Sequence, residues 1–240
     1  MKWQLAGVVA NERESARTHR LVLDVPDWAG HLPGQHLDVR LTAEDGYIAQ
    51  RSYSIASPPE QQHVELVVER LPDGEVSPYL TDELGIGDQL QLRGPIGRWF
   101  VWNTDIVDAP VQLIAGGSGV APFLAMIGHH IATASTVPMH LLYSTRSIDD
   151  VIGGSLLRTS NNVDVTITLS RTAPENWQGA RGRVDAELLM QHVVAAERRP
   201  RVYICGPTSF VEATTMLMIE LGYDAAAIRT ERFGATGGTP

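Results

Sequence analysis

The sequence predicts two domains in succession. We expect an antiparallel β-barrel over residues 1–103, followed by an α/β domain with a doubly wound parallel sheet over residues 104–240. Three observations lead to this fold class. Short strand-like segments recur at roughly ten-residue spacing in the first part, strand and helix patterns alternate in the second, and 43% hydrophobic with 20% charged residues describes a globular protein.

The first domain should consist of short strands, because its segments mix β-branched or apolar residues with polar ones. They are Leu5–Val9, His19–Val25, His36–Leu41, Ser52–Ile55, Val64–Val68 and Gln89–Leu92. Turn signals separate them, such as Pro33-Gly34, Asp45-Gly46, Pro58-Pro59, Asp73-Gly74 and Gly94-Pro95. One helix should interrupt the strands, with Ser77 as its N-cap, Pro78 as its first residue and Gly85 as its stop.

The pattern changes after Asn103, and we place the domain boundary within residues 103–110. Val111–Ala115 is apolar except for Gln112, as expected of a strand buried on both faces. The elements expected after it are a helix from Val120 to Ala132, strands Met139–Tyr143 and Val163–Leu169, helix Asp185–Val194, strand Val202–Ile204, helix Thr208–Leu221 and a last strand at Ile228–Arg232.

Composition excludes several classes of function. The formal net charge of −9 argues against nucleic-acid binding, which requires a basic face. No signal-peptide pattern and no run of ~18 apolar residues is present, so we expect a cytoplasmic protein without a membrane span. Cys205 is the single cysteine, which excludes an internal disulfide and an iron–sulfur cluster held by about four cysteines of this chain. The histidines show no metal-ligand spacing, and we expect the pair His129-His130 on a helix surface.

A glycine-rich turn at Gly116–Pro122 follows a buried strand and opens a helix. Glycines there let the backbone approach a pyrophosphate, and the helix N-terminus offers free N–H groups. An ordinary tight strand-to-helix turn is the alternative. The acid that usually holds the ribose hydroxyls is missing, because the next strand runs into Ser144-Thr145-Arg146. Arg146 could meet a phosphate or could simply be solvated.

A second pattern, Arg51-Ser52-Tyr53-Ser54, lies on a predicted strand. Strand alternation places Arg51 and Tyr53 on one face and the two serines on the other. A guanidinium can grip a pyrophosphate and a phenol ring can stack on a flat heterocycle. A polar strand edge with one ordinary aromatic residue is the alternative at this point.

Together the motifs resemble the ferredoxin–NADP⁺ reductase family across nearly the whole chain. They are Arg-x-Tyr-Ser at 51–54, Gly74-Glu75-Val76-Ser77, the turn Gly116–Pro122, Cys205-Gly206-Pro207 and Glu231-Arg232-Phe233-Gly234, in the family's order. The resemblance implies a flavin-binding barrel and a pyridine-nucleotide domain, in agreement with the two halves read from the residues. It also favours FAD over FMN, which the residues alone leave open.

The resemblance assigns roles position by position. Arg51 would hold the FAD pyrophosphate, Tyr53 would stack on the isoalloxazine, and Ser54 would lie beside the flavin nitrogen that receives the hydride. Cys205 would lie by the nicotinamide, and Phe233 would cover the other flavin face. The catalytic candidates are Ser54 and Cys205. The residues expected at the cofactors are Arg51, Ser52, Tyr53, Ser54, Val68, Gly74, Glu75, Val76, Ser77, Gly117, Ser118, Gly119, Val120, Pro122, Arg146, Ser170, Arg171, Arg181, Cys205, Gly206, Pro207 and Phe233.

The nicotinamide nucleotide is expected to be NADPH, with NADH as the alternative. Ser170-Arg171 follows a strand, and Arg181 and Arg183 come shortly after it. In NADPH-using relatives a similar Ser-Arg pair binds the phosphate on the adenosine ribose, and a dianion there needs fixed cations. The aromatic partner for the adenine that those relatives have is not evident here.

The implied function is electron transfer from NADPH or NADH through FAD to a separate one-electron acceptor, such as a ferredoxin that feeds an oxygenase. With one cysteine in the chain, the acceptor is expected to be another molecule. A reductase of small acceptors (free flavin, quinone or ferric chelates) is one alternative. A non-catalytic flavoprotein subunit that relays electrons within a complex is the other.

Overall fold

The structure is a computed structural model that describes residues 2–103, 109–160 and 162–234. Contacts divide the chain into two compact units, Met1–Asn103 with Ala121–Ala132, and Thr104–Val120 with Thr133–Pro240. Helix α1 (Ala121–Ala132), which we expected in the second domain, is therefore grouped with the first unit by its contacts. The predicted boundary falls largely on residues 104–108, outside the described residues.

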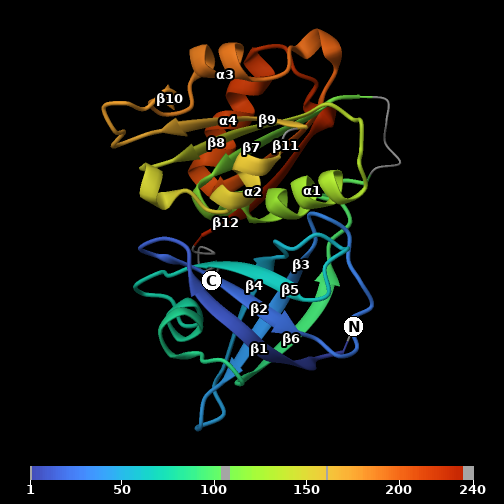
Figure 1. Cartoon of the computed structure of the whole chain (residues 1–240), viewed down its shortest axis with the longest axis vertical. Coiled ribbons are helices and arrows are strands. Elements are labelled where there is room, and N and C mark those ends of the chain that lie inside the picture. The colour runs from blue at the N-terminus through green and yellow to red at the C-terminus, as the bar shows by residue number, and fades with distance from the viewer. Residues whose placement is uncertain (1, 104–108, 161, 235–240) are drawn as a thin grey trace, which may run out of the picture. The chain divides into compact units, whose positions relative to one another are not determined.

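The first unit is an antiparallel sheet of six strands (Figure 1). Their bounds are β1 Gln4–Arg13, β2 Thr18–Asp24, β3 His36–Thr42, β4 Ile48–Ser54, β5 Val64–Glu69 and β6 Gln89–Ile96. The strand order is β4-β3-β6-β1-β2-β5, and an isolated antiparallel bridge between Ile55 and Leu66 links the two ends of this order. The predicted barrel and its predicted strands are confirmed, although hydrogen bonding does not close the barrel completely.

The core of this unit follows from strand alternation. Leu21 and Leu23 of β2 and Leu37 and Val39 of β3 are fully or almost fully buried in one hydrophobic cluster. Side chains two residues apart share a face of a strand, so each strand sends one apolar row into the barrel. Each such buried side chain stabilises the fold by about 1.5–3 kcal/mol relative to its exposure to water.

Two details of the first unit differ from the prediction. The helix is a π-helix, η1 (Tyr79–Glu83), which ends at Leu84, and Ser77 does not cap it. The Ser77 hydroxyl instead accepts the backbone N–H of Leu71 at 3.0 Å, so it closes the preceding turn. The pair Gly94-Pro95, predicted as a turn, lies inside β6.

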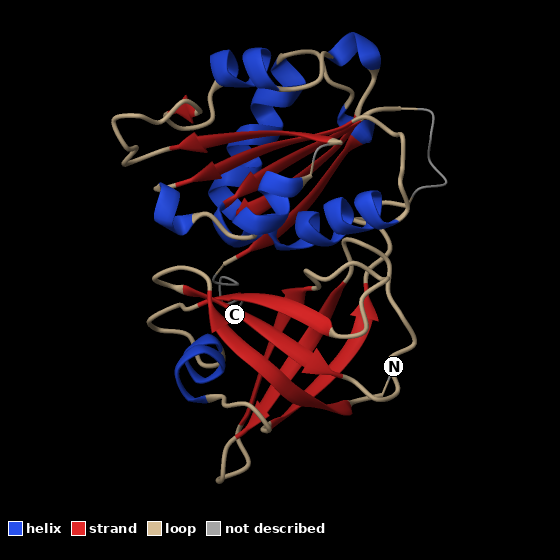
Figure 2. Cartoon of the chain, viewed as in Figure 1, coloured by secondary structure: helices blue, strands red, loops and turns tan. Residues whose placement is uncertain are grey.

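The second unit contains a parallel six-stranded sheet, and helices alternate with its strands (Figure 2). The strands are β7 Val111–Gly116, β8 Met139–Thr145, β9 Val163–Leu169, β10 Ala180–Arg181, β11 Arg201–Pro207 and β12 Ile228–Phe233. The helical segments are η2 Gly117–Val120, η3 Ile148–Asp150, α2 Gly154–Thr159, α3 Ala186–His192, η4 Ala196–Arg198, α4 Thr208–Glu220 and η5 Ala225–Ala227. The sequence did not reveal β10 and α2, because two and six residues are too few to show a period.

The strand order in this sheet is β10-β9-β8-β7-β11-β12. The chain therefore moves outward from β7 in one direction and from β11 in the other. Loops that follow β7 and β11 leave the sheet in opposite directions, and such a switch point is where open parallel sheets bind ligands. The predicted doubly wound sheet is confirmed, with two of the sequence motifs at its switch point.

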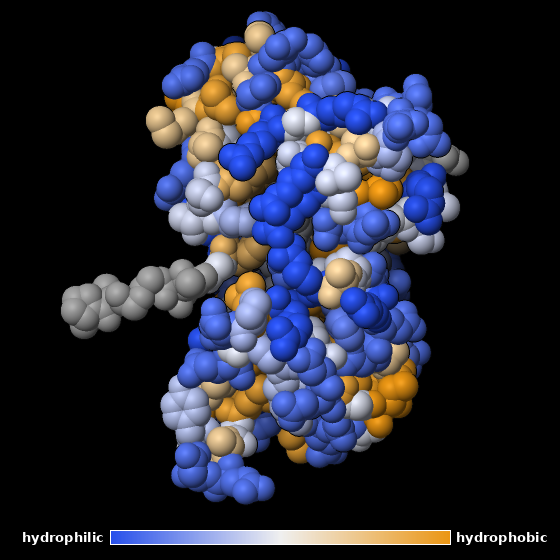
Figure 3. All heavy atoms as spheres, turned by 90° about the vertical axis from the view of Figure 1, so that its left-hand side faces the viewer, coloured by the Kyte–Doolittle hydropathy of each residue, from blue (hydrophilic) through white to orange (hydrophobic). Residues whose placement is uncertain are grey.

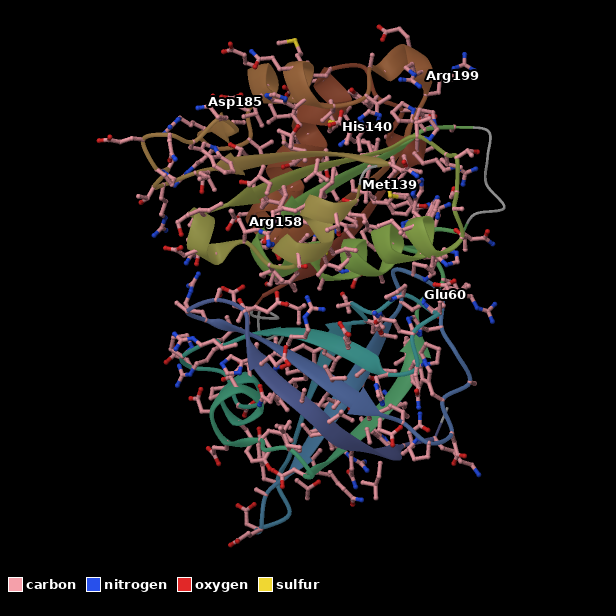
Figure 4. The ribbon with its side chains drawn as sticks, in the orientation of Figure 1. Glu60, Met139, His140, Arg158, Asp185 and Arg199 are labelled. Carbon is pink, nitrogen blue, oxygen red and sulfur yellow. The ribbon has the colours of Figure 1, made fainter. Side chains whose placement is uncertain are left out.

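Helices α3 and α4 pack with sheet residues in a second hydrophobic cluster that includes Leu189, Ile204 and Met218. Helix α3, predicted over Asp185–Val194, spans Ala186–His192, and Asp185 (Figure 4) caps it, since its carboxylate accepts the N–H of Leu188 at 2.9 Å.

Histidines 129 and 130 in α1 differ from the expected surface pair. His130 is 1% exposed, and its ring centroid lies 5.8 Å from that of buried Trp102. His129 Nδ1 lies 2.6 Å from Glu60 Oε1.

No helix in the described part of the chain has the length and apolar character to cross a membrane. The molecular face in Figure 3 is largely hydrophilic, with scattered hydrophobic areas.

Candidate functional site

Strand β4 carries the Arg-x-Tyr-Ser motif with the expected alternation. Ser52 lies opposite Asp38 of β3 and donates its hydroxyl to Asp38 Oδ1 at 2.6 Å. Arg93 Nη2 donates to the other Asp38 oxygen at 2.6 Å, so this face holds a polar network of its own. The half-buried Tyr53 ring packs against the barrel core, and burial raises the pKa of its phenol. Tyr53 is therefore a neutral phenol whose ring is held on one side by the barrel core.

Ser54 ends β4 and is paired with His36 of β3, which in turn is paired with Ile96 of β6. A Cβ at Gly97 would lie 3.5 Å from His36 Nδ1, so this ring lies close to the backbone of the next loop. Burial lowers the pKa of His36, against the opposite effect of Asp38, and the imidazole is neutral at pH 7. Sequence reasoning missed His36, because only strand register places it beside Ser54.

The segment Leu71–Ser77 turns tightly before η1, and the Gly74 N–H donates to the Leu71 carbonyl at 3.0 Å. A Cβ at Gly74 would lie 2.9 Å from Ser77 Oγ and 3.2 Å from the Leu71 carbonyl oxygen. Val76 is fully buried in the barrel core, as is Val68 on β5, so only their backbone groups could reach a ligand. Ser77 is 6% exposed, with its hydroxyl engaged by Leu71.

Glu75 is the exposed member of this turn and forms an ion pair with Arg51. Arg51 Nη2 donates to Glu75 Oε2 at 2.8 Å, and the Tyr47 hydroxyl donates to Glu75 Oε1 at 2.5 Å. The Arg51 guanidinium is thus already directed at the carboxylate of Glu75 in this turn. A diphosphate presents the same acceptor chemistry, and the donor set here fits the diphosphate of FAD.

In the second unit, glycines allow the segment after β7 to lie close to the end of strand β11. A Cβ at Gly119 would lie 2.4 Å from the Cys205 carbonyl oxygen. A Cβ at Gly116 or Gly206 would lie 2.7 or 2.8 Å from the Phe210 ring. Gly117 adopts φ +56°, a left-handed conformation that favours glycine. Close packing thus accounts for three of these glycines, and a phosphate role for the turn stays a prediction.

The other residues of the turn differ in access. Ser118 is partly buried, whereas Val120 and Pro122 are buried, so their side chains pack within the protein. At the switch point, Val120 could therefore offer a ligand only its backbone N–H and carbonyl, and Pro122 only its carbonyl. The polar surface of this turn is therefore mainly backbone, as expected for a phosphate-binding loop.

Strand pairing joins the last two motifs. Cys205 is paired with Ala115 of β7 and Glu231 of β12, and Pro207 is paired with Phe233. Burial raises the pKa of the Cys205 thiol, and Glu231 raises it further. The thiol is 1% exposed and neutral, so its role at a nicotinamide would be contact and shape, without thiolate chemistry.

Arginines gather where β8, β9 and β10 end. The Arg171 N–H donates to the Arg146 carbonyl at 3.0 Å, and the Ser170 hydroxyl donates to the Thr145 carbonyl at 2.9 Å. Arg181 lies opposite Leu169, and its Nη2 donates to the Pro174 carbonyl at 2.9 Å. The structure thus brings together residues that the sequence separates by up to 35 positions (146 to 181). Their exposed cations suit an anionic ligand.

Two family models match the chain. An oxidoreductase FAD-binding domain matches residues 6–101, and an oxidoreductase NAD-binding domain matches residues 113–216. The chain therefore belongs to the oxidoreductases that carry these two domains. It is an oxidoreductase with an FAD-binding and an NAD-binding domain.

Curated relatives of this family include reductase components. The chain is 29% identical over 238 residues to the glycine betaine monooxygenase reductase subunit of Chromohalobacter salexigens, covering 95% of this chain and 63% of that protein. It is 27% identical over 207 residues to the toluate 1,2-dioxygenase electron transfer component of Pseudomonas putida, covering 85% of this chain and 59% of that protein. The chain thus spans less than two thirds of the length of these relatives.

Solved structures share the fold at lower identity. The flavohem-like FAD/NAD-binding domain of nitric oxide dioxygenase from Vibrio cholerae has a TM-score of 0.84 at 24% identity, covering 96% of this chain and 98% of that one. A ferredoxin NADP⁺ reductase from Neisseria gonorrhoeae, with bound FAD and NADP, has a TM-score of 0.82 at 19% identity, covering 97% and 99%.

Proposed function

We propose that this reductase passes electrons from NADPH or NADH through FAD to a separate one-electron acceptor, a ferredoxin that serves an oxygenase. The observation that carries the proposal is that one chain contains both kinds of site. Arg51, next to Tyr53 on β4, is directed at an anionic group, and a glycine-rich turn lies at the switch point of the parallel sheet. Relatives named as reductase or electron transfer components of oxygenases support the acceptor class. The place of action proposed is the cytoplasm.

The proposed division is an FAD domain at residues 1–103 and a nucleotide domain at residues 104–240. The two family models support it, because the first ends at residue 101 and the second begins at residue 113. Helix α1 then belongs to the nucleotide domain by chain order, and its contacts with the first unit are a separate property of the fold.

FAD, when bound, accepts a hydride and releases its electrons singly, so the residues act by binding and positioning. Arg51 and the backbone of Gly74–Ser77 bind the diphosphate, and Tyr53 supports the flavin ring. Ser54 would present a hydroxyl at the ring edge, with the neutral His36 at the paired position of β3. Phe233 covers the other face of the ring.

On the nucleotide side, the loops at Gly117–Pro122 and Cys205–Pro207 bind the phosphates and the nicotinamide. Ser170, Arg171, Arg146 and Arg181 favour NADPH over NADH, because an extra ribose phosphate requires several fixed cations.

The test is an anaerobic titration of the purified protein with NADPH and, separately, NADH, followed by the flavin spectrum. A yellow protein that NADPH bleaches at lower concentration than NADH is expected. A yellow protein that neither nucleotide reduces contradicts the proposal, and a colourless protein that binds no added FAD removes its basis. Turnover with ferredoxin, cytochrome c, free flavin and ferric chelate then distinguishes a protein acceptor from small ones.

A further inference from the structure

The side chains Tyr47, Glu75 and Arg51, hereafter the Glu75 clasp, come from three different segments of the first unit. Tyr47 lies at the tip of the β3–β4 hairpin, Arg51 lies on β4, and Glu75 lies in the turn before η1. Glu75 joins the other two, since its two oxygens accept from the Tyr47 hydroxyl at 2.5 Å and from Arg51 Nη2 at 2.8 Å. An exposed carboxylate is thus held in one place by two donors.

The clasp occupies an N–H donor of Arg51 that could otherwise bind a diphosphate. Arg51 Nη1 donates to its neighbour's carbonyl at Gln50, at 2.7 Å, while Nη2 faces Glu75. Two of the five N–H groups of the guanidinium therefore already have acceptors, and one of them is held by an anion that a phosphate would have to share or displace. Glu75 also follows Gly74 in the turn expected to hold the diphosphate, where like charges repel.

We propose that Glu75, held by Tyr47, competes with the diphosphate of the flavin for Arg51 and thereby limits how tightly the protein retains FAD. This inference rests on the proposed function, because it takes Arg51 as the diphosphate-binding residue. It assigns Glu75 a role opposite to that of a cofactor ligand, although the residue lies in the cofactor-binding turn.

The charge state of the clasp supports competition. The hydrogen bonds from Tyr47 and Arg51 lower the pKa of the Glu75 carboxyl, so the competing anion is present at neutral pH. The Glu75 carboxylate raises the pKa of Tyr47, which remains a hydroxyl donor. The side chains of Arg51 and Glu75 are 48% and 46% exposed, so the competition is modest. Exposed ion pairs of this kind correspond to roughly a two- to fivefold change in affinity.

The test is titration of the full-length apoprotein with FAD, measured by flavin fluorescence. Glu75→Gln keeps the side-chain shape and removes the charge, and we expect it to bind FAD roughly two- to fivefold more tightly than the wild type. Tyr47→Phe should tighten binding in the same direction. It should have no further effect in the Glu75→Gln background, if Tyr47 acts only through Glu75. Asp73→Asn, which removes one exposed charge from the same turn, is the matched control and should leave the affinity unchanged.

Arg51→Gln separates failure of this inference from failure of the proposed site. Loss of roughly tenfold or more in FAD affinity supports the site itself. Weaker or unchanged FAD binding in Glu75→Gln, together with that loss in Arg51→Gln, overturns competition and leaves the site intact. Unchanged FAD binding in Arg51→Gln overturns both. Equal tightening by Asp73→Asn and Glu75→Gln also overturns the inference, because it indicates a general charge effect.

Discussion

The contact between Gly119 and the end of β11 yields the sharpest prediction. In Gly119→Ala the new Cβ would lie 2.4 Å from the Cys205 oxygen, 2.6 Å from its carbonyl carbon and 2.7 Å from the Gly206 nitrogen. All three are backbone atoms of a buried strand, and no side-chain rotation can relieve the overlap. Ordinary carbon contacts begin near ~3.5 Å, so the turn at Gly119 and the end of β11 must separate by about an ångström. Overpacking of this kind costs about 1–3 kcal/mol.

The assay is thermal unfolding together with nucleotide kinetics. For a chain of this length ~1 kcal/mol shifts Tm by about 2–4 °C, and we expect a fall of roughly 2–12 °C in Gly119→Ala. KM for the nicotinamide nucleotide should rise, while FAD content should stay near that of the wild type, because the altered segments belong to the second unit.

Gly117→Ala is the matched control in the same loop. Its Cβ would meet nothing within 4 Å, so its cost comes only from φ +56° and should be about 1–2 kcal/mol. A Gly119→Ala protein with the Tm and KM of the wild type would refute the close approach of the turn to the end of β11.

Three further predictions follow from the other groups. Cys205 should resist a thiol reagent at pH 8 in the native protein and react fully after denaturation, because burial raises its pKa; fast native labelling would contradict this. Arg171→Gln should raise KM for NADPH roughly tenfold or more and leave KM for NADH nearly unchanged; equal changes for both nucleotides would remove Arg171 from the ribose phosphate. Burial alone would raise the pKa of Asp38, but hydrogen bonds from Ser52 and Arg93 lower it on balance. The stability that Asp38 contributes is therefore present above its unfolded pKa of about 3.9 and is lost as pH falls through the lower folded value. Between pH 6 and pH 3, Tm should fall less steeply in Asp38→Asn than in the wild type, and parallel curves would count against the network.

Local pattern was enough to predict most of the elements and the fold class. The alternation at Leu21 and Leu23 and the mainly apolar segment Val111–Ala115 reflect how each strand is buried, and burial periodicity can be read along the chain. The glycines at 116–119 and the Cys-Gly-Pro loop also identify themselves, because their spacing relative to strands and helices is local. Their common place at a switch point was not predicted, and it follows from the order of the strands in the sheet.

Long-range register decided what the pattern could not show. His36 lies beside Ser54, and Glu75 joins Arg51 to Tyr47, through contacts between segments that no local period relates. The Ser77 hydroxyl closes a turn with Leu71, although its sequence context is that of an N-cap. Local sequence thus determined which residues form strands, helices and candidate motifs. Tertiary structure alone decided which acceptor each polar side chain meets, because that choice depends on how distant strands and turns come together in space.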